Sequence, residues 1–151
     1  HYAYQHAQLD ETRRLLLLQN AAFLPMFREA MVKRGKLAVG DLLKLEPADK
    51  DVSLDSLLAR RSSNRDAAAR ATLAYAQQEQ QADEFIRRAR LLVFLKGRDS
   101  HDYKFSSAVL EDYRHISPAW RDRFLAASVY NLRGSGDRDS GTVKRTQQAL
   151  S

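Results

Sequence analysis

The sequence contains no cysteine, and this absence removes several kinds of site at once. Disulfide bridges, thiolate metal ligands and cysteine nucleophiles are all excluded. Proline and glycine are also scarce, with three and six residues among 151. Because turns between short strands depend on these two residues, a fold of many strands is not favoured. No apolar run approaches the roughly 18 residues that a membrane-spanning helix needs, so we expect a soluble protein of unspecified compartment.

The chain also lacks a segment in which charge of one sign is concentrated. Its formal net charge is +6 at pH 7. Residues 1–70 hold 12 Lys/Arg and 9 Asp/Glu, and residues 71–151 hold 13 and 10, so each half carries +3 (12 − 9 and 13 − 10). Proteins that bind nucleic acid usually gather basic residues on one face or in one tail. A weak basic nucleic-acid-binding protein is therefore an alternative that this distribution does not favour.

What remains is the composition of a helical globular protein. Apolar residues make up 44% and charged residues 29% of the chain, which is typical of one domain with its own core. Alanine, leucine, arginine and glutamine are abundant, and all four favour helices. We expect an all-α fold, a single irregular helical domain over residues 1–151 with six or seven helices and no fixed-period repeat. Because the chain begins with His1 and not with methionine, we also expect a processed or trimmed N-terminus.

The segment Ser117–Arg133 is predicted to be a buried central helix. Ser117 followed by Pro118 is typical of a helix start, because serine caps a free amide and proline at the first helical position loses no needed donor. The nine residues from Phe124 to Leu132 carry no charge. At about 100° per residue they reach every side of a helix, so other elements should surround it.

Proline and glutamine residues divide the helices that are predicted before this segment. Pro25 removes a backbone donor, so a first helix should stop or kink at residues 20–24 and a second short helix should follow. A longer helix is predicted over residues 66–96. Its length of about 46 Å exceeds the width of a compact domain of this size. We therefore expect either a break near the glutamines at 77–81 or a projecting N-terminal half.

Two segments are predicted to lie outside regular helices. Residues 35–65 should form an irregular connecting region, in which Ser53 begins a turn or two of helix. Residues 134–141 should form a flexible polar loop before a short final helix. This loop has the glycines and the threonine of a phosphate-binding loop, but it lacks the lysine and follows no strand, and Asp137 and Asp139 would repel phosphate. The phosphate-loop interpretation is therefore rejected.

The predicted core combines the apolar positions of these helices, many of them at i, i+4 spacing. Its members are Leu16, Leu17, Phe23, Phe27, Leu91, Leu92, Phe94, Leu95, Phe105, Val109, Phe124, Leu125, Val129 and Leu132.

The densest group of ionisable residues contains His101, Asp112 and His115. On one helix these three side chains project within about 60° of one another. Carboxylate–imidazole pairs with the spacing of Asp112 and His115 hold iron or manganese in helical bundles. The sequence has no second pair of this kind, and His101 is about 16 Å along the helix from Asp112, so one ion cannot bridge all three. The favoured interpretation is that the residues around His101 cap the start of a helix and that Glu111 and His115 form a surface pair. A metal site is the alternative.

These observations favour a non-enzymatic helical protein-interaction module. The sequence shows no catalytic residue set and no Gly-x-Ser-x-Gly nucleophile motif, and it leaves the cofactor unknown. A protein partner or a second copy is expected, with self-association through the alanine-rich segment Ala67–Gln81 as one form of it. The alternatives are a metal- or cofactor-dependent enzyme that uses His101, Asp112 and His115, and the weak nucleic-acid-binding protein.

Overall fold

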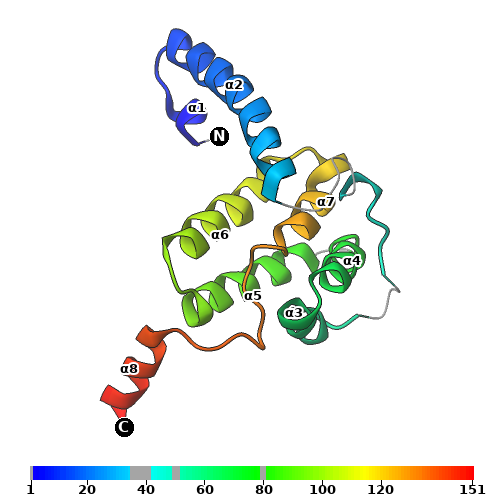
Figure 1. Ribbon diagram of the computed structural model, residues 1–151, viewed down its shortest axis with the longest axis vertical. Coiled ribbons are helices and arrows are strands. Elements are labelled where there is room, and N and C mark those ends of the chain that lie inside the picture. The colour runs from blue at the N-terminus through cyan, green and yellow to red at the C-terminus, as the bar shows by residue number, and fades with distance from the viewer. Residues whose placement is uncertain (1, 35–41, 49–51, 79–80) are drawn as a thin grey trace. The chain divides into compact units, whose positions relative to one another are not determined.

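The computed structural model describes residues 2–34, 42–48, 52–78 and 81–151, and these ranges are helical without strands (Figure 1). They contain eight α-helices and two 3-10 turns, so the predicted all-α class is confirmed with one helix more than expected. Nowhere in these ranges is a helix both long and apolar enough to cross a membrane. The contacts divide the chain into two compact units, His1–Asp41 and Leu42–Ser151. Each unit is described separately.

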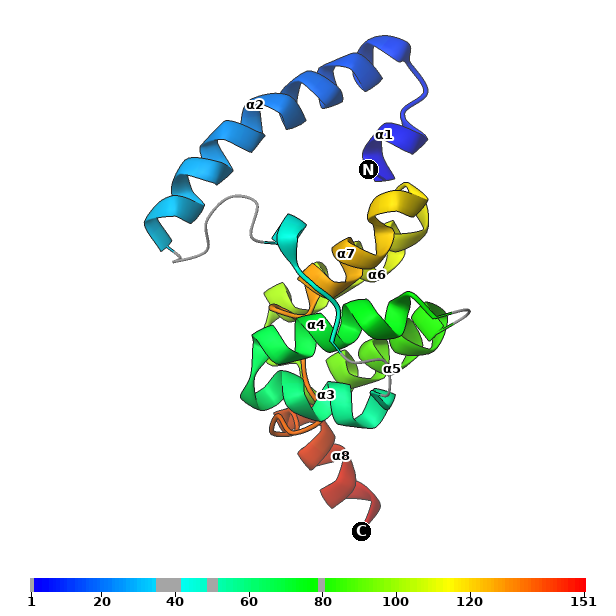
Figure 2. The ribbon, with the colours of Figure 1, turned by 90° about the vertical axis from the view of Figure 1, so that its right-hand side faces the viewer.

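Unit 1 consists of α1 (Tyr2–His6) and α2 (Asp10–Arg34). Figure 2 shows α2 as a gently curved helix without a break. The prediction of two helices separated before Pro25 is wrong, because Pro25 lies inside α2. Proline removes one hydrogen bond, to the carbonyl of Ala21. Both residues are exposed, so water can reach that carbonyl and the bonds on either side keep the helix together.

No described residue of unit 1 is buried. The four predicted core members from this region are therefore wrong: Leu16 is half-buried, and Leu17, Phe23 and Phe27 are 53%, 45% and 63% exposed. The only other described helix of unit 1 is α1, which has five residues and cannot cover a helix of 25. An apolar sequence predicts which side chains gain from burial, but it does not supply the element that covers them.

Unit 2 contains the remaining helices and both 3-10 turns. Their bounds are η1 (Leu42–Lys44), α3 (Leu54–Ser63), α4 (Arg65–Ala76), α5 (Gln81–Lys96), α6 (Ser100–Asp112), η2 (Tyr113–His115), α7 (Pro118–Ser128) and α8 (Gly141–Leu150). In Figure 2, α4 packs between α3 and α7, and α5 packs on α4 and α6. The core of unit 2 lies between these five helices.

The most completely buried helix is α4, in which eight of the 12 residues are buried. The segment predicted as the central helix forms α7, which ends at Ser128 and not at Arg133. Its first turn is exposed, with Trp120 at 51%, and Phe124 is half-buried. The long uncharged run was interpreted as buried on all sides, whereas α7 buries mainly the side that faces α4.

The predicted break near the glutamines is confirmed, since α4 ends at Ala76 and α5 begins at Gln81. Residues 79–80, like 35–41 and 49–51 of the predicted connecting region, lie outside the described residues. Ser53 caps α3 as expected, by accepting a hydrogen bond from the amide of Ser56 at 3.3 Å. This helix has ten residues and not one or two turns, and it contributes Leu57 to the core.

The predicted core of unit 2 is confirmed in part. Five of its members are buried: Leu92, Val109, Leu125, Val129 and Leu132. Leu95 and Phe105 are half-buried. Leu91 and Phe94 are wrong, with 50% and 69% exposure. Because α5 buries positions 82, 85, 86, 89, 92 and 93, the helical period places residues 91 and 94 on its outer side.

Truncation of Leu125 tests this core. Leu125 is fully buried, so Leu125→Ala should lower the free energy of unfolding by about 2–5 kcal/mol, through lost burial and the cavity left behind. Leu91→Ala is the matched control and should change it by about 0.5 kcal/mol or less, because Leu91 is half exposed. Urea unfolding followed by circular dichroism measures both. Equal losses in the two variants would contradict the assignment of the core.

Candidate functional site

Residues 129–140 connect α7 to α8, and hydrogen bonds attach the loop at residues 134–140 to two helices. The amide of Ser135 donates to the carbonyl of Leu58 in α3 at 3.0 Å. The amide of Ser140 donates to the carbonyl of Leu95 in α5 at 2.7 Å. Gly134 is buried against α3, and its amide donates to the carboxylate of Asp137 at 3.0 Å.

Both aspartates of the loop form ion pairs with helices of unit 2. Asp137 lies 3.8 Å from the guanidinium of Arg61, and Asp139 lies 2.7 Å from the amine of Lys96. Burial lowers the pKa of Arg61, while the charge of Asp137 acts in the opposite direction. Asp137 and Asp139 therefore repel a phosphate near this loop less strongly than the sequence suggests, because each carboxylate already has a cationic partner.

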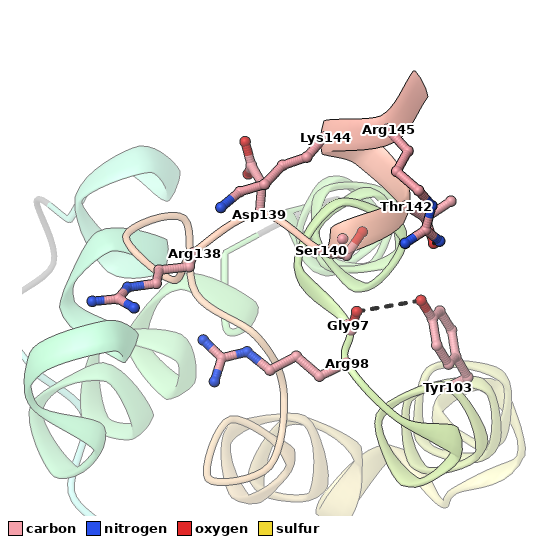
Figure 3. A pocket seen from close by; sticks show the side chains of 10 residues that line it. Gly97, Arg98, Tyr103, Arg138, Asp139, Ser140, Thr142, Lys144 and Arg145 are labelled. Atoms are coloured by element: carbon pink, nitrogen blue, oxygen red, sulfur yellow. Dashed lines mark hydrogen bonds between the residues drawn. The ribbon is translucent and has the colours of Figure 1, made fainter. Parts of the chain in front are cut away.

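A pocket of about 570 Å3 lies where this loop and the start of α8 meet the turn between α5 and α6 (Figure 3). Its lining residues are Gly97, Arg98, Tyr103, Arg138, Asp139, Ser140, Gly141, Thr142, Lys144 and Arg145. Four of them are cations and one is an acid, so the lining has a formal charge of +3 (4 − 1). All four cations are exposed. None of them forms an ion pair with another residue in the described part of the chain.

The start of α8 forms one edge of the pocket. The hydroxyl of Ser140 caps the helix by accepting from the amide of Val143 at 3.3 Å. The amides of the first helical residues, Gly141 and Thr142, have no acceptor among the described residues. In Figure 3, Arg145 extends beside Thr142, to whose hydroxyl its guanidinium donates at 3.4 Å. The basic side chains and the positive end of the helix dipole therefore act on the same space.

An ion pair below the pocket holds the turn between α5 and α6. The guanidinium of Arg133 donates to the carboxylate of Asp102 at 2.6 Å, and the amide of Arg98 donates to the same carboxylate at 2.8 Å. Burial alone would raise the pKa of Asp102, but these hydrogen bonds outweigh it and lower the pKa below its usual value. The hydrogen bond to Asp102 raises the pKa of Arg133. This pair fixes the backbone from which Arg98 extends.

The three residues of the predicted metal site lie on α6 and on η2, which follows it. His101 is exposed in the first turn of α6. Asp99 caps this helix, and its carboxylate accepts a hydrogen bond from the amide of His101 at 2.8 Å. Asp112 ends α6, and His115 is exposed in η2. Within the described residues, no three His, Cys, Asp or Glu side chains are grouped closely enough to hold an ion. A metal at these residues stays a prediction.

The second candidate is the apolar surface of α2. Nine of its large apolar side chains are at least 45% exposed: Leu15, Leu17, Leu18, Phe23, Leu24, Met26, Phe27, Met31 and Val32. Soluble monomers seldom expose so large a contiguous apolar surface, and such surfaces mark interaction sites.

Comparisons with protein-family models, with curated proteins and with solved structures find no match to this chain. The assignment of a function therefore depends on the geometry. Sequence analysis did not identify the basic pocket. The adjacent cations Lys144 and Arg145 beside Ser140 were the signal available, but nothing in the sequence placed Arg98 next to them.

The ion pair of Asp102 makes stability depend on pH. Because its folded-state pKa is lowered, the carboxylate stabilises the fold above its unfolded pKa of about 3.9, and this contribution is lost as the pH falls through the folded value. The free energy of unfolding should therefore decrease below about pH 4, and Asp102→Asn should remove that part of the decrease. Asp55, whose side chain is 84% exposed, provides the control Asp55→Asn. Urea unfolding over a pH series measures the free energy of unfolding of each variant. The prediction would be contradicted if this free energy decreased as steeply below about pH 4 in Asp102→Asn as in the unmodified chain.

The contact of Gly134 with α3 is tested by adding one methyl group. A Cβ at this position would lie 2.8 Å from the carbonyl oxygen of Leu58 and 2.9 Å from the amide of Ser62, so backbone has to move. We expect Gly134→Ala to lower the free energy of unfolding by about 1–3 kcal/mol. At Gly141 the nearest atom is the flexible guanidinium of Arg145 at 3.4 Å, so Gly141→Ala should have little effect. Thermal unfolding gives the midpoint temperature of each variant. Equal midpoint temperatures would contradict the close contact between Gly134 and α3.

Proposed function

We propose that the protein is a non-enzymatic helical protein-interaction module that binds a second copy of itself through α2. The observation that carries this proposal is a stripe of exposed apolar side chains along α2. Leu17, Leu24, Phe27 and Met31 are 53%, 65%, 63% and 60% exposed. Large apolar side chains in such a row gain free energy when a partner removes them from water.

The spacing of the stripe is that of a helix pair. With Asn20, the four residues occupy positions 17, 20, 24, 27 and 31, which alternate by three and four and lie within about 80° of one another. In an antiparallel pair centred on residue 22, Leu17 lies opposite Phe27 of the second copy, Leu24 opposite its Asn20 and Met31 opposite its Arg13. The twofold axis repeats each of these contacts, so the pair of Leu17 and Phe27 occurs twice in the interface. A single polar residue such as Asn20 favours one register over others.

The charges at the two ends of α2 support the antiparallel direction. Its first turn carries Asp10 and Glu11, and Lys33 lies in its last turn. An antiparallel pair places acidic and basic ends side by side and opposes the two helix dipoles, whereas a parallel pair brings like charges together. The preference is modest, because these side chains are exposed.

The stripe leaves enough apolar surface for association. Full burial of a large apolar side chain gains about 1.5–3 kcal/mol, and these side chains are 53–65% exposed, so eight of them from two copies gain about 7–14 kcal/mol. Association costs about 4–15 kcal/mol in lost freedom of motion. The gain is comparable with this cost, and the flanking Leu16 and Phe23 add to it.

This proposal places self-association on a different surface from the one that the sequence suggested. In the described part of the alanine-rich segment Ala67–Gln81, the alanines that would form an apolar face are already covered: Ala71 and Ala74 are 0% and 5% exposed inside unit 2. An alanine that already contacts α3 or α7 gains nothing from a second copy.

The proposal is tested with one charged substitution on each side of α2. Leu24→Asp introduces a carboxylate into the stripe and should produce a monomer, because a buried unpaired charge is costly. Leu18→Asp is the matched control: Leu18 is 66% exposed, compared with 65% for Leu24, and it faces the opposite side of the helix. Sedimentation equilibrium should give a dimer for the unmodified chain and for Leu18→Asp.

Two results would contradict the proposal. One is a monomer for the unmodified chain at concentrations of about 100 μM, where an interface of this gross gain should be occupied. The other is binding of the monomer to neutral lipid vesicles through the same residues, which would assign α2 to a membrane surface.

A further inference from the structure

We propose that the basic pocket of unit 2 binds a small phosphate-bearing molecule that also contains a flat ring, such as a mononucleotide. This site lies in unit 2 and does not depend on the self-association of α2. Three features of the pocket favour such a ligand: its cations, its size and the aromatic side chain in its wall.

The cations are the first feature. Arg98, Arg138, Lys144 and Arg145 line one hollow, and in the described part of the chain they form no ion pair. Six other cations of unit 2, by contrast, each have a carboxylate within 4.0 Å: Arg61, Arg87, Arg88, Lys96, Arg114 and Arg133. Like charges gathered without an acid repel one another. A dianionic phosphate would relieve that repulsion.

The single acid in the lining does not oppose a phosphate. The carboxylate of Asp139 is bound to the amine of Lys96 at 2.7 Å. The free amides of Gly141 and Thr142 add donors beside the cations. Arginine guanidinium groups suit phosphate because they donate two parallel hydrogen bonds.

The size of the pocket favours a small molecule over a nucleic-acid strand. A volume of about 570 Å3 lies within the range of about 300–1,000 Å3 that small-molecule sites occupy. Strands need a groove in which cations and aromatic rings repeat over several nucleotides. Here the four cations line a single hollow, between the loop, the turn after α5 and the start of α8.

Tyr103 supplies the contact for a ring. It is 39% exposed in the wall of the pocket, and its hydroxyl donates to the carbonyl of Gly97 at 3.4 Å, which orients the ring. Phe94 supports it with a ring centroid 6.5 Å away. Figure 3 shows Tyr103 on the same side of the pocket as Arg145. A flat ring on Tyr103 would therefore leave an attached phosphate within reach of the start of α8.

The test is calorimetric titration of the whole chain at low ionic strength with inorganic phosphate, adenosine and adenosine monophosphate. We expect the monophosphate to bind more tightly than phosphate, and adenosine not to bind measurably. The double variant Arg138→Gln/Lys144→Gln should lower the affinity for the monophosphate at least about tenfold, because two charged hydrogen bonds are lost. The matched control Arg60→Gln/Arg70→Gln has the same change in net charge away from the pocket and should bind normally.

Substitutions of Tyr103 separate the ring from the phosphate. Tyr103→Ala should lower the affinity for the monophosphate about fivefold or more and leave inorganic phosphate unchanged, whereas Tyr103→Phe keeps the ring and should retain most of the affinity. Circular dichroism checks that each variant is folded.

Several results would overturn the proposal: no binding of the monophosphate, equal binding of adenosine, or equal losses in the pocket and control variants. Much tighter binding of a mixed-sequence oligonucleotide or of anionic lipid vesicles, lost in the same pocket variant, would also overturn it. Either one would assign the cations to a polymer or to a lipid surface.

Discussion

The close approach of α3 and α7 to α4 is the constraint on which unit 2 depends. Five of the eight buried residues of α4 are alanines. Because the side chain of alanine is only a methyl group, α3 and α7 can approach α4 closely. Leu57 of α3 and Leu125 of α7 fill the remaining space and are fully buried. Thr72, also fully buried, donates its hydroxyl to the carbonyl of Ala68 at 2.8 Å, which brings a polar group into this contact with its hydrogen bond satisfied.

This packing determines where the loop before α8 lies. The helix α3 supplies Arg61, which donates to the carbonyl of Val129 at 3.2 Å and pairs with Asp137. The end of α5 supplies Lys96 for Asp139. Since both helices are held by the core, the loop is attached to parts of the chain that cannot move independently. The pocket is a consequence of that attachment, because it brings the cations at the start of α8 to the turn after α5.

The two units differ in how their apolar residues are covered. In unit 2, large apolar side chains pack between five helices, and a charged pocket lies at the edge of the core. In unit 1, a helix of 25 residues has only one short described helix beside it, so its apolar side chains remain exposed. The proposed association through α2 and the proposed ligand site therefore use separate surfaces, and neither requires the other.

The sequence by itself determined what depends on neighbouring residues: the cap at Ser53, the break at the glutamines and the all-α class. The sequence did not show that α2 continues through Pro25, because that depends on whether the remaining hydrogen bonds of α2 outweigh the one that proline removes. It did not decide which apolar residues are buried, because burial depends on the element that covers them. Nor did it identify the pocket: Asp139 looked repulsive to phosphate because its partner Lys96 lies 43 residues away. Only the tertiary structure brings such residues together.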